Sequence, residues 1–377
     1  MSLGEWTVRA RQDVSYRVTQ VTEVLSPAND ALAQAVGLTP GARRLVVVDE
    51  QVFALHGARI QEYFLSRKTV PHILRLPGGE HTKTIPSLEE IVRAADSIAL
   101  ARREPITAVG GGVLTDLVGL AAGLYRRGTP FVRIPTTLVG MVDAAVGAKN
   151  AVNFHGHKNR LGTYHPARDT LVDRAFLRTL DTRHISNGMA EIIKMAVIHD
   201  AALFDLLDAE AEQLVRHRLD GSAGQEVVRR AIGGMLEELE PNLWEHELRR
   251  AVDFGHTFSP GFEMAARPGL LHGEAVSIDM ALSCALAVDQ GLQSPADAVR
   301  VLRLLRRSGL PVWHPVCEVG LLWDALGEST RHRDGRQNIP LPVGIGKCVF
   351  VNELTEPELR RSVDVLHRLL DEEGLAA

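Results

Sequence analysis

The chain has few of the features that mark disulfide-stapled or nucleic-acid-binding proteins. Its 377 residues include only three cysteines, Cys284, Cys317 and Cys348, which lie far apart and form no CxxC pair. We therefore expect neither a disulfide scaffold nor a zinc ribbon, but buried apolar side chains in a reducing cytoplasm. The 42 Lys and Arg residues are outnumbered by 47 Asp and Glu residues, and no basic block occurs. A broad nucleic-acid surface is not expected, so a small-molecule partner is the default.

Long apolar segments free of charge are also missing. The N-terminal sequence MSLGEWTVRARQD is polar and lacks the apolar stretch of about 7–15 residues that a secretion signal needs. Two longer apolar stretches, 106–125 and 275–292, contain Asp116 and Asp279 respectively. Both are typical of buried core rather than of a membrane span. We expect a cytoplasmic protein without a membrane partner.

The first half of the chain alternates short apolar runs with helical patterns. Segments 45–49, 106–109 and 131–135 are predicted strands. Between the first two, Ser87 and Glu90 have the spacing of a capping box ahead of a helix. Strand, helix and strand in this order predict a parallel sheet.

The second half is predicted to be mainly helical. Helix-like spacing recurs at 190–207, 224–239, 273–290, 295–308 and 357–370. Segment 150–178 is interpreted as a loop-rich connector. The length fits two domains at roughly 100–200 residues each, and we place them at 1–178, an α/β domain, and 179–377, a helical domain. A ligand is expected between them.

A triple glycine follows the second predicted strand and opens a helical run. In Gly110-Gly111-Gly112, backbone N–H groups can approach a pyrophosphate without interference from a Cβ. A plain tight turn explains the same residues. Asp49, at the end of the first predicted strand, can accept hydrogen bonds from ribose hydroxyls or can be a solvated strand-end residue.

Three residues in the second half have the composition of a catalytic metal site. Glu191 lies three residues before Lys194 on a predicted helix, so both project from one face. His256 and His272 are each flanked by glycine in apolar segments. One Glu and two His leave an open position for a substrate oxygen on a divalent cation. Core histidines remain the alternative.

A third group of polar residues suits a phosphate monoester. Asp143, Lys149, Lys158 and Asn159 lie within a short stretch, and compact cations with an amide bind phosphate well. Arg127 could add to this group. Arg126 fits a solvated helix end better.

Several long motifs occur together and in one order. They are GGGVLTDLVGLAAGLYRRGTPFVRIPTTLVGMVDAAVGAKNAVNFHGHKNRLGTYHP, NGMAEIIKMAVI, VDFGHTFSP and LLHGEAV. Over roughly residues 40 to 355 the chain resembles the dehydroquinate synthase-like sugar phosphate cyclases, and within them the 2-epi-5-epi-valiolone synthases, which act on sedoheptulose 7-phosphate in C7-cyclitol biosynthesis. The resemblance implies a Rossmann-like NAD-binding domain followed by a helical domain that supplies metal ligands.

The resemblance also implies which residues form the site. Glu191, His256 and His272 would hold Zn²⁺ or Co²⁺. The NAD site would comprise Asp49, Glu80, Lys83, Gly111, Gly112, Val113, Asp116, Thr136, Thr137, Asp143, Lys149, Lys158 and Thr179. The catalytic residues would be Asp143, Lys149, Lys194, Asn159, Arg249 and Asp253. The substrate phosphate would contact Lys149, Asn159 and, from the neighbouring subunit, Arg127, so that a homodimer is implied.

The family reaction begins with oxidation of a hydroxyl by NAD beside the metal. Phosphate elimination, return of the hydride and an intramolecular aldol closure follow, so NAD is regenerated.

Four positions bear on the substrate. Relative to dehydroquinate synthases, Pro260 replaces a histidine, Asp253 an asparagine and Met235 a lysine, while Arg249 is retained. Fewer donors and an added anion should repel a substrate carboxylate, so we expect a neutral heptulose phosphate. Asn150 replaces a more usual threonine after Lys149, so the assignment to one subgroup of the cyclases depends in part on this position.

The same residues are compatible with other functions. A 2-epi-valiolone synthase or a desmethyl-4-deoxygadusol synthase would use the same substrate. A metal-dependent alcohol dehydrogenase would need no phosphate cluster, and a non-catalytic sugar-phosphate binder would need no intact metal site.

Overall fold

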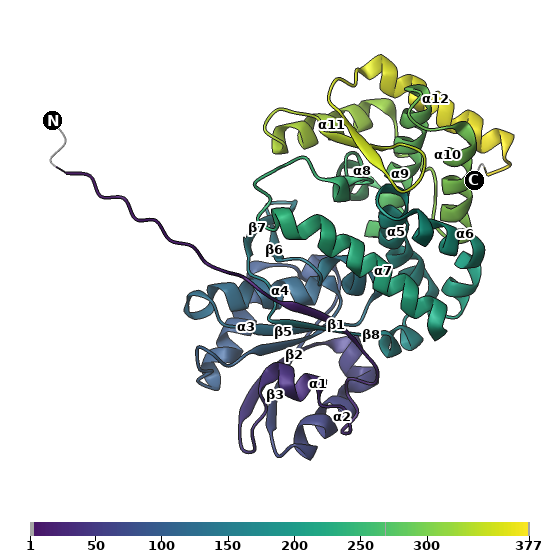
Figure 1. Ribbon diagram of the computed structural model, residues 1–377. Coiled ribbons are helices and arrows are strands. Elements are labelled where there is room, and N and C mark those ends of the chain that lie inside the picture. Colours follow the sequence, from purple (N-terminus) through teal and green to yellow (C-terminus); the bar gives the residue numbers. More distant parts are fainter. Residues whose placement is uncertain (1–3, 268, 376–377) are drawn as a thin grey trace.

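Six parallel strands form the sheet of the first half, in the order β1-β8-β5-β4-β2-β3. The computed structural model describes residues 4–267 and 269–375 (Figure 1). The strands are β1 Arg17–Val21, β2 Arg43–Asp49, β3 Val70–Leu76, β4 Ile106–Gly110, β5 Phe131–Pro135 and β8 Asp169–Asp173. The predicted strands at 45–49, 106–109 and 131–135 are thus confirmed as β2, β4 and β5.

Helices cover both faces of the sheet. Along β2, Val46 and Val48 pack into one hydrophobic core, while Leu45 and Val47 pack into the other, because successive side chains of a strand point to opposite faces. The first core takes in α1 Ala31–Val36 and α2 Glu50–Ser66; the second takes in α3 Ile85–Ser97 and α4 Gly112–Leu124. Double coverage explains why this strand is continuously apolar.

Two local predictions in this half are wrong. Helix α3 begins at Ile85, before the predicted capping box at Ser87, and its N-cap is Thr84, whose side chain accepts from the Ser87 backbone N–H. Pro86 fits the first turn because its N–H is not needed there. Segment 150–178 is not mainly loop, since it contains the hairpin strands β6 Lys149–Phe154 and β7 His157–Tyr164, and also β8. Strand β7 is largely exposed, so its sequence lacks an apolar alternation.

The second half is helical, as predicted. Its helices are α5 Thr182–Ile198, α6 Ala201–Arg216, α7 Gly221–Leu239, α8 Ser259–Ala265, α9 His272–Asp289, α10 Pro295–Arg307, α11 Val319–His332 and α12 Glu356–Glu372, with a hairpin of β9 Ile339–Pro342 and β10 Cys348–Val351. Short helical turns lie at Glu80–Thr82, Tyr125–Arg127, Gly140–Ala144, Arg174–Thr179, Glu240–Asn242 and Ala251–Asp253.

One predicted helix is interrupted. The helix expected over 190–207 is two helices, because the chain is extended at Asp200 and its carboxylate caps α6 by accepting from the Leu203 N–H at 3.0 Å. The helices expected at 224–239, 273–290, 295–308 and 357–370 are confirmed as α7, α9, α10 and α12.

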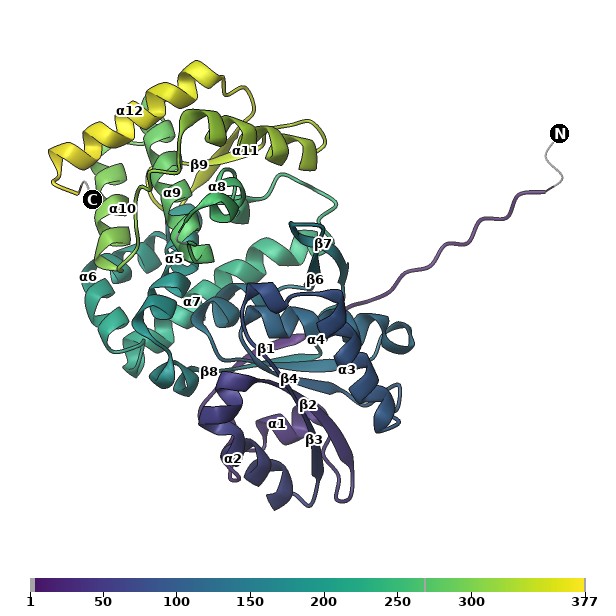
Figure 2. The ribbon, with the colours of Figure 1, turned by 180° about the vertical axis from the view of Figure 1, so that it is seen from behind.

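Helix α5 joins the two halves. It is buried along most of its length, from Ile185 to Ile198, and it packs on α9 and on the turn Gly140–Ala144 (Figures 1 and 2). The predicted boundary at 178/179 falls between β8 and α5 and stays a prediction. Among the described residues, Cys284 and Cys317 are buried, Cys348 is partly buried and all three are unpaired. No helix in the described ranges has the length and apolar character needed to span a bilayer.

Candidate active site

Three potential metal ligands converge from three separate segments of the helical half. Glu191 comes from the middle of α5, His256 from the turn after Ala251–Asp253, and His272 is the first residue of α9. The Glu191 Oε1 atom lies 3.0 Å from His272 Nε2 and 3.7 Å from His256 Nε2, and the two Nε2 atoms are 3.4 Å apart. The predicted ligand set is therefore brought together, with the ligand atoms of all three residues within 4.8 Å of one another.

The carboxylate of Glu191 has a cation beside it but no hydrogen bond. Within the described residues, both of its oxygens are buried without a hydrogen-bond partner, although Lys194 Nζ lies 2.5 Å from Oε2 and 3.6 Å from Asp143 Oδ1. Burial opposes its ionisation, but Lys194 and the two imidazoles hold the pKa of Glu191 well below its usual range. A buried carboxylate that faces two imidazoles and an ammonium but, in the described part of the chain, no backbone N–H group fits a cation ligand.

Neighbouring groups orient both imidazoles. His256 Nδ1 lies 3.1 Å from the Phe254 carbonyl oxygen, so Nδ1 is the donor nitrogen and Nε2 is left to face Glu191. His272 Nδ1 lies 3.6 Å from Glu263 Oε2. Burial lowers the pKa of His272, but Glu191 and Glu263 more than reverse this and raise it to about 10 in the absence of a cation.

Glycines allow α5 to lie close to its neighbours. A Cβ on Gly273 would come within 2.0 Å of the Asn187 carbonyl oxygen, and one on Gly188 within 2.4 Å of the Leu138 Cβ. Only glycine permits such approaches. Gly273 of the HGE motif therefore permits the close approach of α9 to α5, and Gly188 of the NGMAE motif permits that of α5 to Leu138.

The predicted cofactor residues lie at the carboxyl ends of the central strands. The first turn of α4 follows β4 directly, and its N-cap, Gly111, provides no side-chain cap. A Cβ on Gly111 would lie 3.1 Å from Thr137 Cγ2, and one on Gly112 would lie 3.1 Å from Ala144 Cβ. Bare N–H groups at a helix N-terminus form a ready site for a pyrophosphate.

Two other strand ends complete this edge of the sheet. Asp49 ends β2 and caps α2 by accepting from the Gln51 and Val52 N–H groups. A Cβ on Gly78 would lie 2.4 Å from the Asp49 carboxylate. Thr136 is buried directly after β5, where its N–H donates to the Gly110 carbonyl oxygen at 3.0 Å.

Lys83 connects two predicted site residues. Its ammonium lies 2.6 Å from Asp116 Oδ2 and 2.6 Å from Asn159 Oδ1. Burial raises the pKa of Asp116, and the charge of Lys83 offsets part of that effect. Glu80 Oε1 accepts from Asn153 Nδ2 at 2.9 Å, and Asn153 Oδ1 accepts from the Asn159 N–H at 2.9 Å. The Gly79-to-Lys83 segment and the β6–β7 hairpin thus form one polar network.

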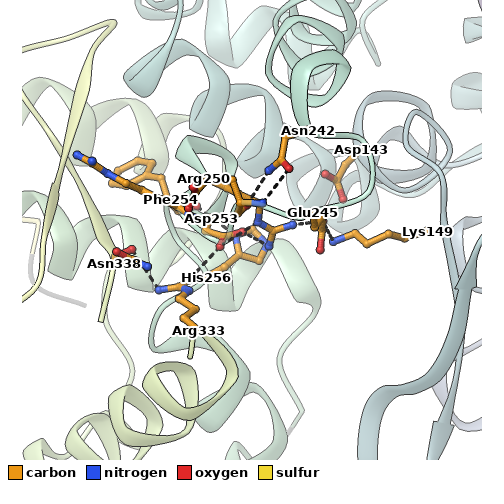
Figure 3. Close-up of polar contacts among 12 residues, drawn as sticks. Asp143, Lys149, Asn242, Glu245, Arg250, Asp253, Phe254, His256, Arg333 and Asn338 are labelled. Carbon is orange, nitrogen blue, oxygen red and sulfur yellow. Dashed lines mark hydrogen bonds and ion pairs between the residues drawn. The ribbon is translucent and has the colours of Figure 1, made fainter. Parts of the chain in front are cut away.

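A chain of charges extends from β6 to the turn Ala251–Asp253 (Figure 3). Lys149 Nζ lies 2.7 Å from Glu245 Oε1, which also pairs with Arg250, while Tyr164 donates to the other Glu245 oxygen at 3.2 Å. Although 59% of the Lys149 side chain is exposed, loss of water around the ammonium and the nearby Arg250 lower its pKa to about 8.

The structure weakens the argument that Asp253 repels an anion. Its carboxylate lies 2.5 Å from Arg250 Nη2 and 3.2 Å from Arg333 Nη2 (Figure 3). Burial opposes ionisation, but the two guanidinium groups lower the Asp253 pKa overall. Asp253 is therefore not an isolated anion, and charge repulsion alone does not explain the choice of substrate.

Arg249 is not part of this cluster. It is exposed, and its guanidinium lies over the Phe350 ring at 4.6 Å from the centroid. The adjacent Arg250 contacts Asp253 instead. Lys158, predicted to contact cofactor, pairs with Glu263 Oε1 at 2.6 Å.

The remaining predicted residues lie at the margins of these clusters. Arg127 and Thr179 are exposed, and the Thr179 hydroxyl donates to the Phe176 carbonyl oxygen at 3.1 Å. Val113 lies in the first turn of α4. Pro260 is in the first turn of α8. Met235 is buried in the core, so it fills space there.

Sequence reasoning missed Glu245, Arg250, Glu263 and Arg333. Each is a charged residue in a polar or helical segment without a motif of its own. For Arg250, the only signal was its place beside Arg249. For Glu263, the only signal was its place between the two histidine motifs, four positions after Ser259, on what the structure shows to be a short helix.

Family models match the chain in two adjoining blocks. The model described as 3-dehydroquinate synthase N-terminal matches residues 73–187, and the one described as 3-dehydroquinate synthase C-terminal matches residues 188–330. The chain belongs to the 3-dehydroquinate synthase family, which confirms the resemblance to dehydroquinate synthase-like cyclases and the predicted fold class.

Within this family, the chain is similar to several named enzymes. A 2-epi-5-epi-valiolone synthase of Streptomyces hygroscopicus subsp. jinggangensis (strain 5008) is 53% identical over 95% of this chain and 88% of its own length. A demethyl-4-deoxygadusol synthase of Trichormus variabilis is 38% identical over 93% of this chain and 87% of its own length. The solved 2-epi-5-epi-valiolone synthase ValA from Streptomyces hygroscopicus subsp. jinggangensis 5008, with NAD⁺ and Zn²⁺ bound, superposes with a TM-score of 0.92 at 52% identity, covering 96% of this chain and 99% of that one.

Proposed function

We propose that the chain is a sugar phosphate cyclase that converts sedoheptulose 7-phosphate into 2-epi-5-epi-valiolone and phosphate, with NAD and a divalent cation, Zn²⁺ or Co²⁺, as cofactors. The observation that carries this proposal is the convergence of Glu191, His256 and His272 beside Lys194 and Asp143. The high identity to a named 2-epi-5-epi-valiolone synthase supports the substrate.

The residues fit both cofactors. The buried Glu191 carboxylate and two Nε2 atoms are donors that Zn²⁺ accepts, and the glycine-lined start of α4 leaves room for a pyrophosphate. When bound, NAD accepts and returns a hydride, and the cation polarises substrate oxygens.

The chain's own charged groups would act on the substrate. The Lys194 ammonium, fully buried between Glu191 and Asp143, stays cationic because these anions offset the effect of burial on its pKa. It would stabilise negative charge that develops on a substrate oxygen. Asp143 lies in a π-helical turn at Gly140–Ala144, a distortion frequent at functional sites, and would hold the Lys194 ammonium in place.

Lys149 and Asn159 would bind the phosphate. Lys83 occupies the Asn159 Oδ1 atom, so the Nδ2 group is the donor end that can reach a phosphate oxygen. Lys149 reaches Glu245 across the two halves and would exchange this carboxylate for phosphate. Arg250, rather than Arg249, would be the guanidinium paired with Asp253 in the site.

The test is incubation of metal-loaded protein with sedoheptulose 7-phosphate and catalytic NAD, following phosphate, NADH and the product's NMR spectrum. Phosphate release without NADH accumulation and a 2-epi-5-epi-valiolone spectrum is the expected result. Formation of a different cyclitol epimer, or of demethyl-4-deoxygadusol, would support the assignment as a cyclase but contradict the proposed product. Net NADH without phosphate would indicate an alcohol dehydrogenase, and no turnover would overturn the substrate.

We further propose a homodimer in which Arg127 reaches the partner's substrate phosphate. Arg126 and Arg127 both have positive φ, 52° and 62°, and strain of this kind clusters at functional sites. Mixing refolded Arg127→Ala and Glu191→Ala chains tests this, because each mixed dimer would regain one intact site. Random pairing gives about a quarter of the wild-type activity; no regain would overturn the shared site.

We also propose a cytoplasmic location, because the substrate and NAD are both phosphorylated and do not cross membranes freely. Cell fractionation with an activity assay tests this. Activity confined to the culture medium or the membrane fraction would contradict it.

A further inference from the structure

One buried acidic residue that the proposed reaction does not use lies between the two halves of the site. Glu263 is on α8, and its side chain is only 9% exposed. One carboxylate oxygen lies 2.6 Å from Lys158 Nζ on β7, and the other lies 3.6 Å from His272 Nδ1 at the start of α9. The carboxylate therefore spans from the sheet-containing half to a candidate metal ligand.

The side chain of Lys158 extends from β7 toward Glu263. Lys158 and Asn159 are adjacent on β7, where Asn159 has a positive φ of 52° beside an irregular pairing of β6 with β7. Asn159 turns to Lys83 in the sheet-containing half, whereas Lys158 turns to α8. The ion pair with Glu263 is the contact the structure gives Lys158.

A second buried carboxylate fixes the position of α8. Asp279 Oδ2 accepts from the Phe258 and Ser259 N–H groups at 2.5 and 2.8 Å. These N–H groups lie where the His256 turn becomes α8. Asp279 is two helical turns after His272 on α9, so both residues lie on nearly the same helix face. Helix α8 is thus tied to the helix that presents His272, and the Glu263 backbone has a defined position relative to that imidazole.

The two nitrogens of His272 face different carboxylates. Nε2 faces Glu191 at 3.0 Å, and Nδ1 faces Glu263. A carboxylate on Nδ1 keeps that nitrogen protonated and leaves the Nε2 lone pair for a metal ion.

We propose that Glu263 is a positioning residue that orients His272 for the cation, and that Lys158 holds Glu263 in place from the other half of the molecule. Metal affinity then depends on contact between the two halves, so Lys158 links the phosphate- and cofactor-binding side to the metal side. The inference rests on the proposed metal site.

The experiment measures Zn²⁺ affinity by competition with a chromogenic chelator, and the Co²⁺ absorption spectrum, for the metal-stripped full-length protein. Loss of such an outer carboxylate typically weakens metal binding by about 10–100-fold, and this is the result expected for Glu263→Gln. Lys158→Met should weaken Zn²⁺ binding less. The double variant should match Glu263→Gln, because Lys158 acts through Glu263. Glu212→Gln, which removes a surface ion pair with Arg307, is the control and should bind Zn²⁺ as wild type does.

The outcomes separate this inference from the proposed function. Failure of the wild-type protein to bind Zn²⁺ would overturn the metal site itself. Equal affinity of wild type and Glu263→Gln would overturn the role of Glu263, and additive losses in the double variant would overturn the link through Lys158. If Glu263→Gln does not fold, the Lys158→Met variant provides the test. Weaker Zn²⁺ binding by this variant would support the link through Glu263, whereas unchanged Zn²⁺ affinity would overturn it, because a lysine that only binds phosphate does not affect the metal.

Discussion

The two sides of the candidate site are built in different ways. The cofactor side consists largely of backbone at the ends of β2, β4 and β5, where Gly111 and Gly112 admit close approach. The metal side consists of side chains from three segments, which come together because α5 packs on α9 and on the turn Ala251–Asp253. The first is fixed by local sequence, and the second by tertiary structure. Apart from the Lys158–Glu263 ion pair that connects them, substitutions should therefore affect the two sides separately.

The largest expected effect is on the metal side. His272→Ala removes one of the three proposed metal ligands, at the first residue of α9, while the helix start retains its Glu274 cap. We expect phosphate release to fall by on the order of 10³-fold or more, since a bound cation supplies several kcal/mol. Far-UV circular dichroism and NAD affinity should stay unchanged. A parallel loss of NAD binding would break the separation of the two sides.

Removal of Lys194 tests the charge balance of the same side. Lys194→Met leaves the buried Glu191 carboxylate without its ammonium, which typically costs about 3–5 kcal/mol. Urea unfolding of the metal-free protein should show this loss. The exposed Lys347 provides the control, because Lys347→Met should change the free energy of unfolding by no more than about 0.5 kcal/mol. Equal stability of the two variants would contradict the pairing.

Asp279 gives the metal side a distinctive pH dependence. Burial raises its pKa from 3.8 to about 6. As pH rises from about 4 to 6, the unfolded chain loses this proton while the folded protein keeps it, so folding stability falls by about 2–3 kcal/mol. The Asp279→Asn variant has no carboxyl group at this position, so its stability should lack this pH dependence. The difference in unfolding free energy between variant and wild type should change by that amount across this window, and a constant difference would contradict the assignment.

Sequence predicted part of the local structure, including three of the six strands of the sheet. Strands β2, β4 and β5 follow from apolar runs that are buried on both faces. The two proposed histidine ligands are each flanked by glycine, and one of these glycines, Gly273, is required where α9 approaches Asn187 on α5. Strand β8 was missed because an aspartate stands at each of its ends and leaves only three residues between them. The break between α5 and α6 was missed because one capping aspartate, Asp200, decides it.

What the sequence could not give is the direction of individual side chains. Arg249 and Arg250 are adjacent and chemically identical, yet one lies over Phe350 and the other pairs with Asp253. Lys158 resembles a cofactor-binding lysine, but Glu263, which pairs with it, is more than a hundred residues away. These outcomes depend on contacts between distant segments, which no local pattern records.

A substitution at Gly111 should weaken NAD binding without affecting the metal side. Gly111→Val places a branched side chain near Thr137 Cγ2, which lies 3.1 Å from where a Cβ would be. Overpacking of this kind costs about 1–3 kcal/mol, so NAD affinity, measured by fluorescence titration, should fall by about 10–100-fold while Zn²⁺ affinity is unchanged. Gly233→Ala on α7, where nothing lies near a Cβ, is the control. Loss of Zn²⁺ binding by Gly111→Val would show that the two sides are not independent.

The smallest effect is expected at Asn150, which departs from the usual threonine. Asn150 is buried beneath the cofactor side, where Oδ1 accepts from Arg133 at 2.5 Å and Nδ2 donates to the carbonyl oxygens of Ala148 and His165. Asn150→Ala deprives a fully buried guanidinium of an acceptor, which costs about 1–2 kcal/mol.

Because these contacts are all to scaffold groups, Asn150→Ala should lower stability and leave the cyclitol product unchanged. Gly119→Ala tests the same packing from the other side, since a Cβ there would come within 1.7 Å of Asn150 Oδ1; it should also destabilise without altering the product. Urea unfolding and product NMR separate the two roles. A changed epimer at unchanged stability would mean that Asn150 takes part in the choice of product, whereas lost stability with the same epimer assigns it to the support beneath the cofactor side.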